Sequence, residues 1–233
     1  MMIFSALRRK KAKQKCLEGD GPAYLKSYFE REGAKPVPST SISDVRFVVF
    51  DTETTGFHIK RDKVISVGAV VVHQHMIHMD QSLEAIVQTQ SKNKSKAIPV
   101  HGIISEEITQ GCVSYEANKE FVDLIGADVM VAHHANFDVR MMEKMISEEM
   151  SGFRFYNPVL DTVMLAKKLL YPTTSLEHLS PTKLSLDTLI NQFGLTASDR
   201  HTAWGDALIT AKLLLIILKQ FEQRGITNLK DLR

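Results

Sequence analysis

Apolar residues along the chain follow two spacings, one typical of β-strands and one typical of α-helices. Apolar, β-branched runs predict strands at residues 46–50, 63–73, 82–88 and 128–133. Apolar positions spaced three and four residues apart predict helices at residues 115–126, 138–150, 161–171, 184–194 and 202–225. Three early strands followed by mixed strands and helices predict an α/β fold with a mixed sheet.

The first 44 residues differ from the rest in charge and composition. They hold nine Lys or Arg against five Asp or Glu, a net charge of +4, which leaves −2 for residues 45–233. Helical spacing at residues 21–33 and a Pro- and Ser-rich stretch at residues 35–43 predict a short helix followed by a linker. We therefore expect residues 1–44 to form a basic N-terminal extension with one or two short helices, outside the main domain. The basic run at residues 8–15 fits either a contact with phosphates or a solvated arm.

The overall composition is that of a soluble globular protein. Of the 233 residues, 44% are hydrophobic and 24% are charged. Cys16 and Cys112 lie far apart without metal-binding or redox spacing, which suits a reducing cytosol. The apolar run at residues 213–218 is too short to span a bilayer, and the first apolar residues precede the basic cluster, the wrong order for a secretory signal. We expect a cytoplasmic protein without a membrane partner.

Two carboxylates follow the hydrophobic strand predicted at residues 46–50. Asp51 and Glu53 stand one residue apart, so both side chains share one face of an extended chain. Uncompensated carboxylates at the end of a buried strand repel each other and are costly to desolvate. A divalent cation such as Mg²⁺ or Mn²⁺ would resolve that conflict, whereas solvated charges at the strand end are the simpler alternative.

Further carboxylates favour the cation. Asp138 stands where a strand meets a helix, a place where it would also serve as an N-cap. Asp206 lies in an otherwise apolar helix, beside a stripe of alanines at four-residue spacing (Ala203, Ala207 and Ala211). Small side chains let a helix approach a sheet closely, and a buried carboxylate needs a partner. We expect this helix to carry Asp206 toward Asp51 and Glu53.

A histidine precedes the same helix. His201 lies five residues before Asp206, a spacing that does not stack two side chains on a helix, so we expect it in the lead-in loop. Histidine titrates near neutral pH and is the usual general base. His201 is therefore a candidate base.

These motifs together resemble a known superfamily. "FDTETTG" (50–56), "HHANFD" (133–138) and "HTAWGDA" (201–207) are similar, in order and spacing, to the three motifs of the DEDDh, or DnaQ-like, 3′→5′ exonucleases. That superfamily includes the epsilon subunit of bacterial DNA polymerase III and ribonuclease T. The resemblance covers about residues 45–220, with a weaker similarity at residues 98–103. It implies a ribonuclease H-like α/β fold, a central mixed sheet flanked by helices, and an exonuclease domain at residues 45–233.

The resemblance also implies roles for five residues. Asp51, Glu53 and Asp206 look like the main ligands of two divalent cations, Mg²⁺ or Mn²⁺, with Asp51 bridging both. Asp138 looks like a ligand of the second ion, often through water, and His201 like the base that deprotonates the attacking water.

A substrate-binding strip is implied beside the first motif. The backbone around Thr54, Thr55 and Gly56 would hold the terminal nucleotide, and Phe57 would take the wedge place usually given to an aliphatic residue. His134 stands where the superfamily commonly has Asn, so contacts to the substrate strand are expected to differ there.

Several further acidic, histidine and aromatic residues are not expected to belong to the site. We expect Asp161 to cap a helix and Asp187 to lie in the first turn of another. His73 and His75 fall where a hairpin should turn, and neither Cys nor carboxylate completes a zinc site there. Trp204 is expected to pack against the sheet, with base stacking as the alternative.

The predicted function is a metal-dependent 3′→5′ exonuclease that releases nucleoside 5′-monophosphates from single-stranded ends. The expected partners are single-stranded DNA, or RNA, 3′ ends, and DNA polymerase III if the enzyme proofreads. Two alternatives stay open: an enzyme that trims RNA or short oligonucleotides, and a non-catalytic nucleic-acid-binding or polymerase-associated module. The sequence leaves the oligomeric state open.

Overall fold

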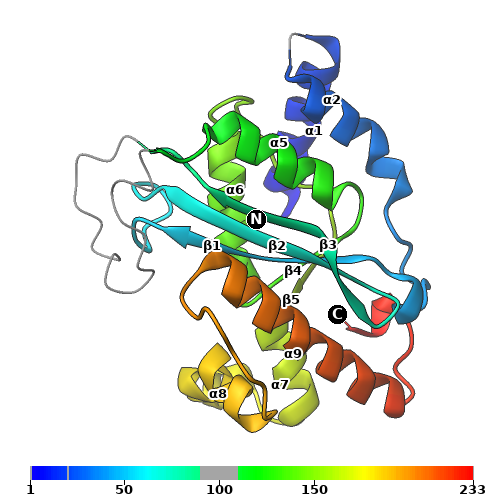
Figure 1. The fold of residues 1–233 in the computed structure, drawn as a ribbon. Helices are drawn as coiled ribbons and strands as arrows, with labels where there is room; N and C mark the ends of the chain where they lie inside the picture. The colour runs from blue at the N-terminus through cyan, green and yellow to red at the C-terminus, as the bar shows by residue number, and fades with distance from the viewer. Residues whose placement is uncertain (1, 20, 90–109, 233) are drawn as a thin grey trace.

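The apolar runs assemble into one mixed sheet at the centre of the computed structural model, which describes residues 2–19, 21–89 and 110–232. Its strands are β1 (Phe47–Thr54), β2 (Val64–His73), β3 (Met76–Ile86), β4 (Val129–Ala132) and β5 (Val159–Asp161). Their order is β3-β2-β1-β4-β5, as Figure 1 shows. β1 pairs antiparallel with β2, and β2 with β3, whereas the β1–β4 and β4–β5 pairs are parallel. The predicted mixed sheet is confirmed.

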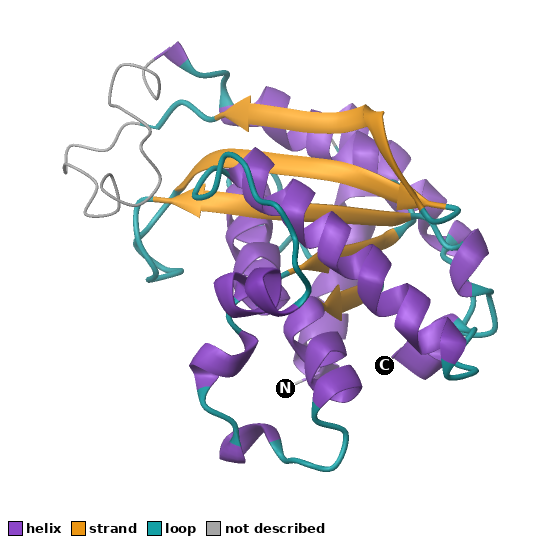
Figure 2. Cartoon of the chain, turned by 60° about the horizontal axis from the view of Figure 1, so that its bottom comes forward, coloured by secondary structure: helices purple, strands orange, loops and turns teal. Residues whose placement is uncertain are grey.

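Helices cover both faces of this sheet. α2 (Ala23–Glu30), α5 (Ser114–Ile125) and α6 (Ala135–Ile146) pack with the residues of one apolar cluster. α7 (Thr162–Leu170), α8 (Leu186–Gln192) and α9 (Ala203–Gln223) form the other cluster, and Figure 2 shows helices on either side of the strands. The predicted α/β class is therefore confirmed.

Several element boundaries differ from those predicted. β3 begins at Met76, six residues earlier than expected, because its first half is solvent-exposed and lacks an apolar run. The helix expected at residues 138–150 is α6, which begins at Ala135 and ends at Ile146. β5 was not predicted, since three residues are too few to show a period.

The β2–β3 hairpin turns at two residues with left-handed backbone conformations, Gln74 (φ 50°) and His75 (φ 60°). Two-residue hairpin turns require such angles to match the twist of the strands. This confirms the predicted turn. Within the described residues, the histidines here are not part of a group that would hold a metal.

The N-terminal extension is helical and packs against the domain. α1 (Met2–Glu18) is followed by α2, whose Tyr28 and Phe29 are fully buried in the apolar cluster with α5 and α6. Part of the stretch predicted as a linker is also fixed in place, because the backbone N–H of Ile42 donates to the carbonyl of Thr227 (2.8 Å). The functional division at residue 44 stays a prediction.

Two further observations complete the fold. No helix within the described residues combines the length and the apolar character that a membrane span requires. The weaker similarity at residues 98–103 lies outside the described part of the chain.

Candidate active site

The two carboxylates of the first motif lie within β1, which runs on to Thr54. Phe47 and Val49 of this strand belong to the apolar cluster of α9, whereas Val48 and Phe50 belong to the opposite cluster. By strand alternation, Asp51 and Glu53 face the same side as Phe47 and Val49. The predicted shared face is therefore the face that α9 covers.

A glycine in β2 lets α9 approach this face. Gly68 pairs with Asp51 in the β1–β2 ladder. A Cβ atom on Gly68 would lie only 2.3 Å from the backbone of Ala203, the first residue of α9. The predicted alanine stripe is buried as well, with Ala207 and Ala211 at 0% exposure. The missing side chain of Gly68 and the small side chains of the alanines place the start of α9 directly beside Asp51.

Asp206 lies in the first turn of α9, not in its middle as the apolar pattern suggested. The helix begins one residue after Thr202, whose side-chain oxygen accepts from the N–H of Gly205 (3.0 Å). A Cβ atom on Gly205 would lie 1.9 Å from the carbonyl oxygen of Asp199, so the turn into the helix requires glycine there. A carboxylate is favoured at this helix end by the backbone dipole.

Three carboxylates converge as a result. One oxygen from each of Asp51, Glu53 and Asp206 lies within 4.8 Å of the other two. Burial, followed by the charges of Asp138, Asp206 and Glu53, raises the pKa of Asp51 well above its ordinary value. Burial and the charges of Asp206 and Asp138 raise the pKa of Glu53 to about 7. The cluster therefore carries more negative charge than its surroundings compensate.

Asp138 lies beside this group without joining it. It occupies the first turn of α6, and the N-cap position belongs to His134 instead. One of its carboxylate oxygens accepts from the hydroxyl of Thr52 (2.6 Å) and from the backbone N–H of Thr52 (3.2 Å). Burial raises the pKa of Asp138 to about 7, against the lowering effect of these hydrogen bonds. The structure brings Asp138 close enough to perturb Asp51 but not into the three-residue cluster.

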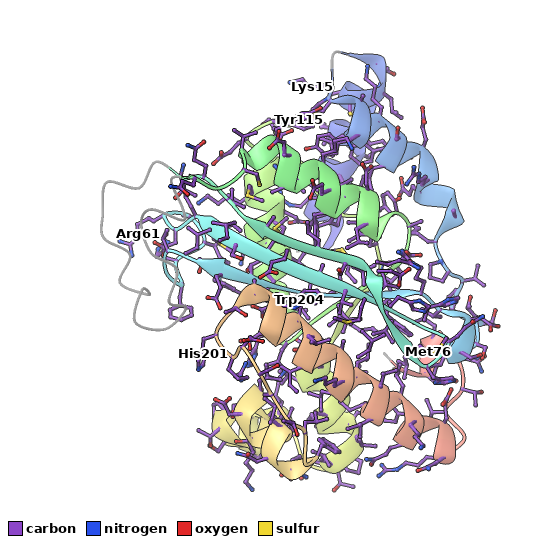
Figure 3. The ribbon with its side chains drawn as sticks, in the orientation of Figure 1. Lys15, Arg61, Met76, Tyr115, His201 and Trp204 are labelled. Carbon is purple, nitrogen blue, oxygen red and sulfur yellow. The ribbon has the colours of Figure 1, made fainter. Side chains whose placement is uncertain are left out.

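His201 lies in the loop that leads into α9, as predicted, and its side chain is exposed (Figure 3). Its backbone is left-handed (φ 64°), and its N–H donates to Asp206 (3.4 Å). Histidine is among the residues that tolerate this conformation. The backbone of His201 is thereby tied to a member of the acidic cluster.

The strip after β1 forms a tight loop. The hydroxyl of Thr54 donates to the carbonyl of Gly56 (2.8 Å), and the N–H of Thr55 donates to Lys63 (2.9 Å). A Cβ atom on Gly56 would lie 2.7 Å from the Asp62 carboxylate, which accepts from the loop backbone. This explains the glycine independently of any ligand.

Phe57 follows this loop and is 86% exposed, with its ring centre 6.2 Å from that of Phe137. Its ring is therefore accessible from solvent beside the acidic cluster's strand. Trp204, in the first turn of α9, is less exposed than Phe57. Its side chain is partly buried against the apolar cluster of that helix, as expected (Figure 3).

His134 occupies a left-handed position (φ 63°) at the start of α6. Asn and His are both enriched in this conformation, which gives a backbone reason for finding His in place of Asn. Its N–H donates to Asp161 (3.1 Å), and Asp161 also caps α7 by accepting from Val163 (2.9 Å). The predicted capping role of Asp161 is confirmed.

Sequence reasoning missed Arg200. Its guanidinium contacts Asp206 and also lies 2.7 Å from Asp187, which is in the first turn of α8 as predicted. Asp187 was left outside the site, and Arg200 links it to the acidic cluster. The sequence does place Arg200 directly before the candidate base His201. Residue spacing, however, does not show which groups the long side chain of Arg200 contacts.

The donor set fits divalent cations. Asp51, Glu53 and Asp206 offer carboxylate oxygens, the ligands that Mg²⁺ and Mn²⁺ prefer. Burial, followed by mutual repulsion, raises the pKa values of Asp51 and Glu53, and a cation between the carboxylates would relieve the repulsion. An acidic centre of this kind on a mixed-sheet domain is suited to metal-assisted hydrolysis.

Comparison with known proteins identifies the family to which the chain belongs. The model of the exonuclease family named RNase_T matches residues 48–214, and the chain belongs to this family. A DNA polymerase III PolC-type protein from Thermotoga maritima is 30% identical over 210 residues, 90% of this chain and 14% of the relative. A DNA polymerase III subunit epsilon-like protein from Rhodobacter capsulatus is 31% identical over 201 residues, 85% of this chain and 27% of the relative. The chain thus spans a small part of these relatives.

Solved structures share the fold. Escherichia coli exonuclease I in complex with a dT13 oligonucleotide superposes with a TM-score of 0.64 at 14% identity, over 78% of this chain and 43% of that one. Exonuclease X in complex with 5′ overhanging duplex DNA gives a TM-score of 0.57 at 22% identity, over 81% of this chain and 98% of that one. The ribonuclease H-like architecture and the membership in the DnaQ-like superfamily are confirmed.

Proposed function

We propose that this exonuclease-family domain is a metal-dependent 3′→5′ exonuclease that removes nucleoside 5′-monophosphates from single-stranded DNA. The observation that supports it most is the convergence of Asp51, Glu53 and Asp206 to within 4.8 Å. The relatives named as DNA polymerase III proteins, and the neighbours solved with DNA, favour this substrate.

Two Mg²⁺ or Mn²⁺ ions are the proposed cofactors. Asp51, Glu53 and Asp206 would hold these ions, with Asp138 beside them as a further ligand. When bound, the two ions supply an activated water and stabilise charge on the leaving oxygen of an in-line displacement. Burial, followed by the charges of Asp206 and Asp138, raises the pKa of Glu53 to about 7, and the ions would neutralise the second contribution.

The remaining residues handle the proton and the substrate. His201, exposed beside Asp206, takes the proton of the attacking water. The backbone of Thr54, Thr55 and Gly56 holds the terminal nucleotide, and the exposed ring of Phe57 stacks on its base. His134 contacts the substrate strand.

Degradation of a 5′-labelled oligonucleotide tests the function. With Mg²⁺ or Mn²⁺ the wild-type protein should shorten the strand stepwise from its 3′ end. Asp51→Asn should reduce the rate by at least about 100-fold, since it would remove one of the three converging carboxylates that hold the cations, while the protein stays folded. Asp80→Asn, at an exposed position of β3, is the control and should retain full activity. An intact oligonucleotide with every metal and strand length would refute the proposal.

The substrate class is tested by the same assay. Matched DNA, RNA and very short strands separate a DNA exonuclease from an RNA- or oligonucleotide-trimming enzyme, since discrimination depends on contacts to the 2′-OH. Binding without cleavage would favour a non-catalytic module. The names of the relatives extend the proposal to proofreading beside DNA polymerase III. Proofreading predicts faster removal of a mismatched than of a matched 3′ nucleotide, and co-elution with the purified polymerase.

A further inference from the structure

Arg200 connects the acidic cluster to a carboxylate outside it. One terminal nitrogen of its guanidinium contacts Oδ1 of Asp206, whose side chain is 13% exposed. Its Nε and its other terminal nitrogen lie 3.3 and 2.7 Å from Oδ1 of Asp187, whose side chain is 68% exposed. The guanidinium therefore spans from a buried member of the cluster to the protein surface.

The charge of Arg200 acts on the whole cluster. Its positive charge lowers the pKa of both Asp51 and Glu53, although burial and the neighbouring carboxylates outweigh it. Within the described part of the chain, Arg200 is the basic side chain that forms an ion pair with a member of the cluster. It therefore partly compensates the repulsion among the carboxylates.

A divalent cation would compete with this arginine. Oδ1 of Asp206 already accepts from the guanidinium of Arg200 and from the N–H of His201. A cation held by Asp206 and its neighbours would add positive charge within a few ångströms of the guanidinium and repel it. Metal binding and the Arg200–Asp206 contact thus oppose each other.

We propose that Arg200 is a built-in counter-ion that neutralises the cluster until divalent cations bind, and that Asp187 retains its guanidinium at the edge of the site when they do. This inference rests on the metal site of the proposed function. Arginine suits the task because its planar fork bonds two carboxylates at once and stays charged at all relevant pH values. Arg200 is a positioning residue in this scheme, since it acts through Asp206.

Under this proposal Arg200 and Asp187 have opposite effects on the affinity of the cluster for divalent cations. Arg200 weakens cation binding, because its contact with Asp206 must break first. Asp187 makes that step easier, because the released guanidinium keeps its hydrogen bonds to Asp187. Without Asp187, Asp206 is the carboxylate among the described residues that still pairs with the guanidinium.

Binding of Mn²⁺ to the full chain, measured by calorimetry or electron paramagnetic resonance, tests the first effect. Arg200→Gln should bind Mn²⁺ on the order of tenfold more tightly than the wild type, because no charged hydrogen bond has to be broken. Its metal-free melting temperature should fall. Arg46→Gln breaks a comparable Arg–Asp pair with Asp128, remote from the cluster, and should lower the melting temperature without changing Mn²⁺ affinity.

A double-mutant cycle tests the role of Asp187. Asp187→Asn should weaken Mn²⁺ binding several-fold in the wild-type background and have little effect in Arg200→Gln. A loss that persists in the Arg200→Gln background would show that Asp187 acts through long-range charge alone, and would overturn its retaining role.

The outcomes distinguish a failure of the Arg200 counter-ion role from a failure of the proposed metal-dependent function. A wild-type protein that binds no Mn²⁺ refutes the metal site itself. Wild-type binding that Arg200→Gln leaves unchanged or weakens refutes the counter-ion role alone. If Arg200→Gln does not fold without metal, Arg200→Lys replaces it, and because lysine lacks the fork that spans Asp206 and Asp187, Mn²⁺ affinity should again rise.

Discussion

The acidic cluster makes the stability of the metal-free protein depend on pH. The pKa of Glu53 rises from 4.5 to about 7 on folding, and that of Asp138 from 3.8 to about 7, chiefly through burial. The folded state therefore binds more protons than the unfolded state between these limits, so the free energy of unfolding decreases as pH rises through that range. Above this pH range the free energy of unfolding falls no further on account of Glu53 and Asp138, because both carboxylates are charged in the folded and the unfolded states.

This predicts a melting temperature that falls from about pH 5 to about pH 8 in the presence of EDTA. Glu53→Gln should flatten the fall, because glutamine cannot ionise, whereas Glu177→Gln at an exposed site should not. Mn²⁺ should restore stability most strongly at the high-pH end. A melting temperature that is level or rises over this range without metal would contradict the raised pKa values.

At the scale of single residues, the sequence predicted which carboxylates converge better than it predicted their surroundings. Strand alternation suffices to place Asp51 and Glu53 on one face, and that prediction is confirmed. Arg200 was missed because the reach of a long, flexible side chain depends on the packing of the loop before α9 against α8. No periodicity in the sequence records such a contact.

At the scale of elements, the site depends on how closely α9 approaches β2. Gly68→Ala would place a methyl group 2.3 Å from the backbone of Ala203, and helix backbone cannot shift without moving Asp206 as well. We expect a destabilisation of about 1–3 kcal/mol, typical of overpacking, together with weaker Mn²⁺ binding. Urea denaturation and calorimetry measure the two effects.

Gly33→Ala is the matched control, because nothing lies within 4 Å of a Cβ atom at that position. It should change neither stability nor metal affinity measurably. If Gly68→Ala bound Mn²⁺ as tightly as the wild type, the contact between α9 and β2 would not be what positions Asp206.

Element prediction from the sequence succeeded where the apolar pattern was long. The spacing of residues 202–225 predicted α9 within two residues at each end, and its alanine stripe predicted the close packing. The pattern misjudged Asp206 as a mid-helix residue, since Thr202 caps the helix and places Asp206 in its first turn. It also missed β5, whose pairing with β4 depends on a distant segment and not on local pattern.

At the scale of the whole molecule, part of the N-terminal extension belongs to the core. Tyr28 of α2 is buried and stacks on Tyr156 with ring centres 4.2 Å apart. Its hydroxyl donates to Asn157 (2.6 Å) and accepts from the N–H of Tyr156 (3.0 Å). Residues separated by more than a hundred positions thereby share one apolar cluster, a relation that the charge and proline content of residues 1–44 does not reveal.

Two truncations test whether the domain begins before residue 45. A chain that starts at residue 21 keeps α2 and should remain folded, because the side chains of α1 that the structure describes as buried, Ala12 and Cys16, are small. A chain that starts at residue 45 loses Tyr28 and the rest of α2, exposes the cluster around Tyr156 and leaves Asn157 without its buried donor. Removing one large aromatic side chain from a core already costs roughly 3–5 kcal/mol. Since domains are stable by only about 5–15 kcal/mol, the shorter chain should unfold or aggregate.

Tyr28→Phe isolates the polar part of this effect in the full chain. It keeps the ring and removes the hydroxyl, so the N–H of Tyr156 and the side chain of Asn157 lose their buried partner, at a cost of about 1–3 kcal/mol. Thermal unfolding followed by circular dichroism measures the stability of the truncated chains and of Tyr28→Phe. Equal melting temperatures for the full chain and the chain from residue 45 would show that the extension is dispensable, and that the domain boundary predicted from composition is also the boundary of the folding unit.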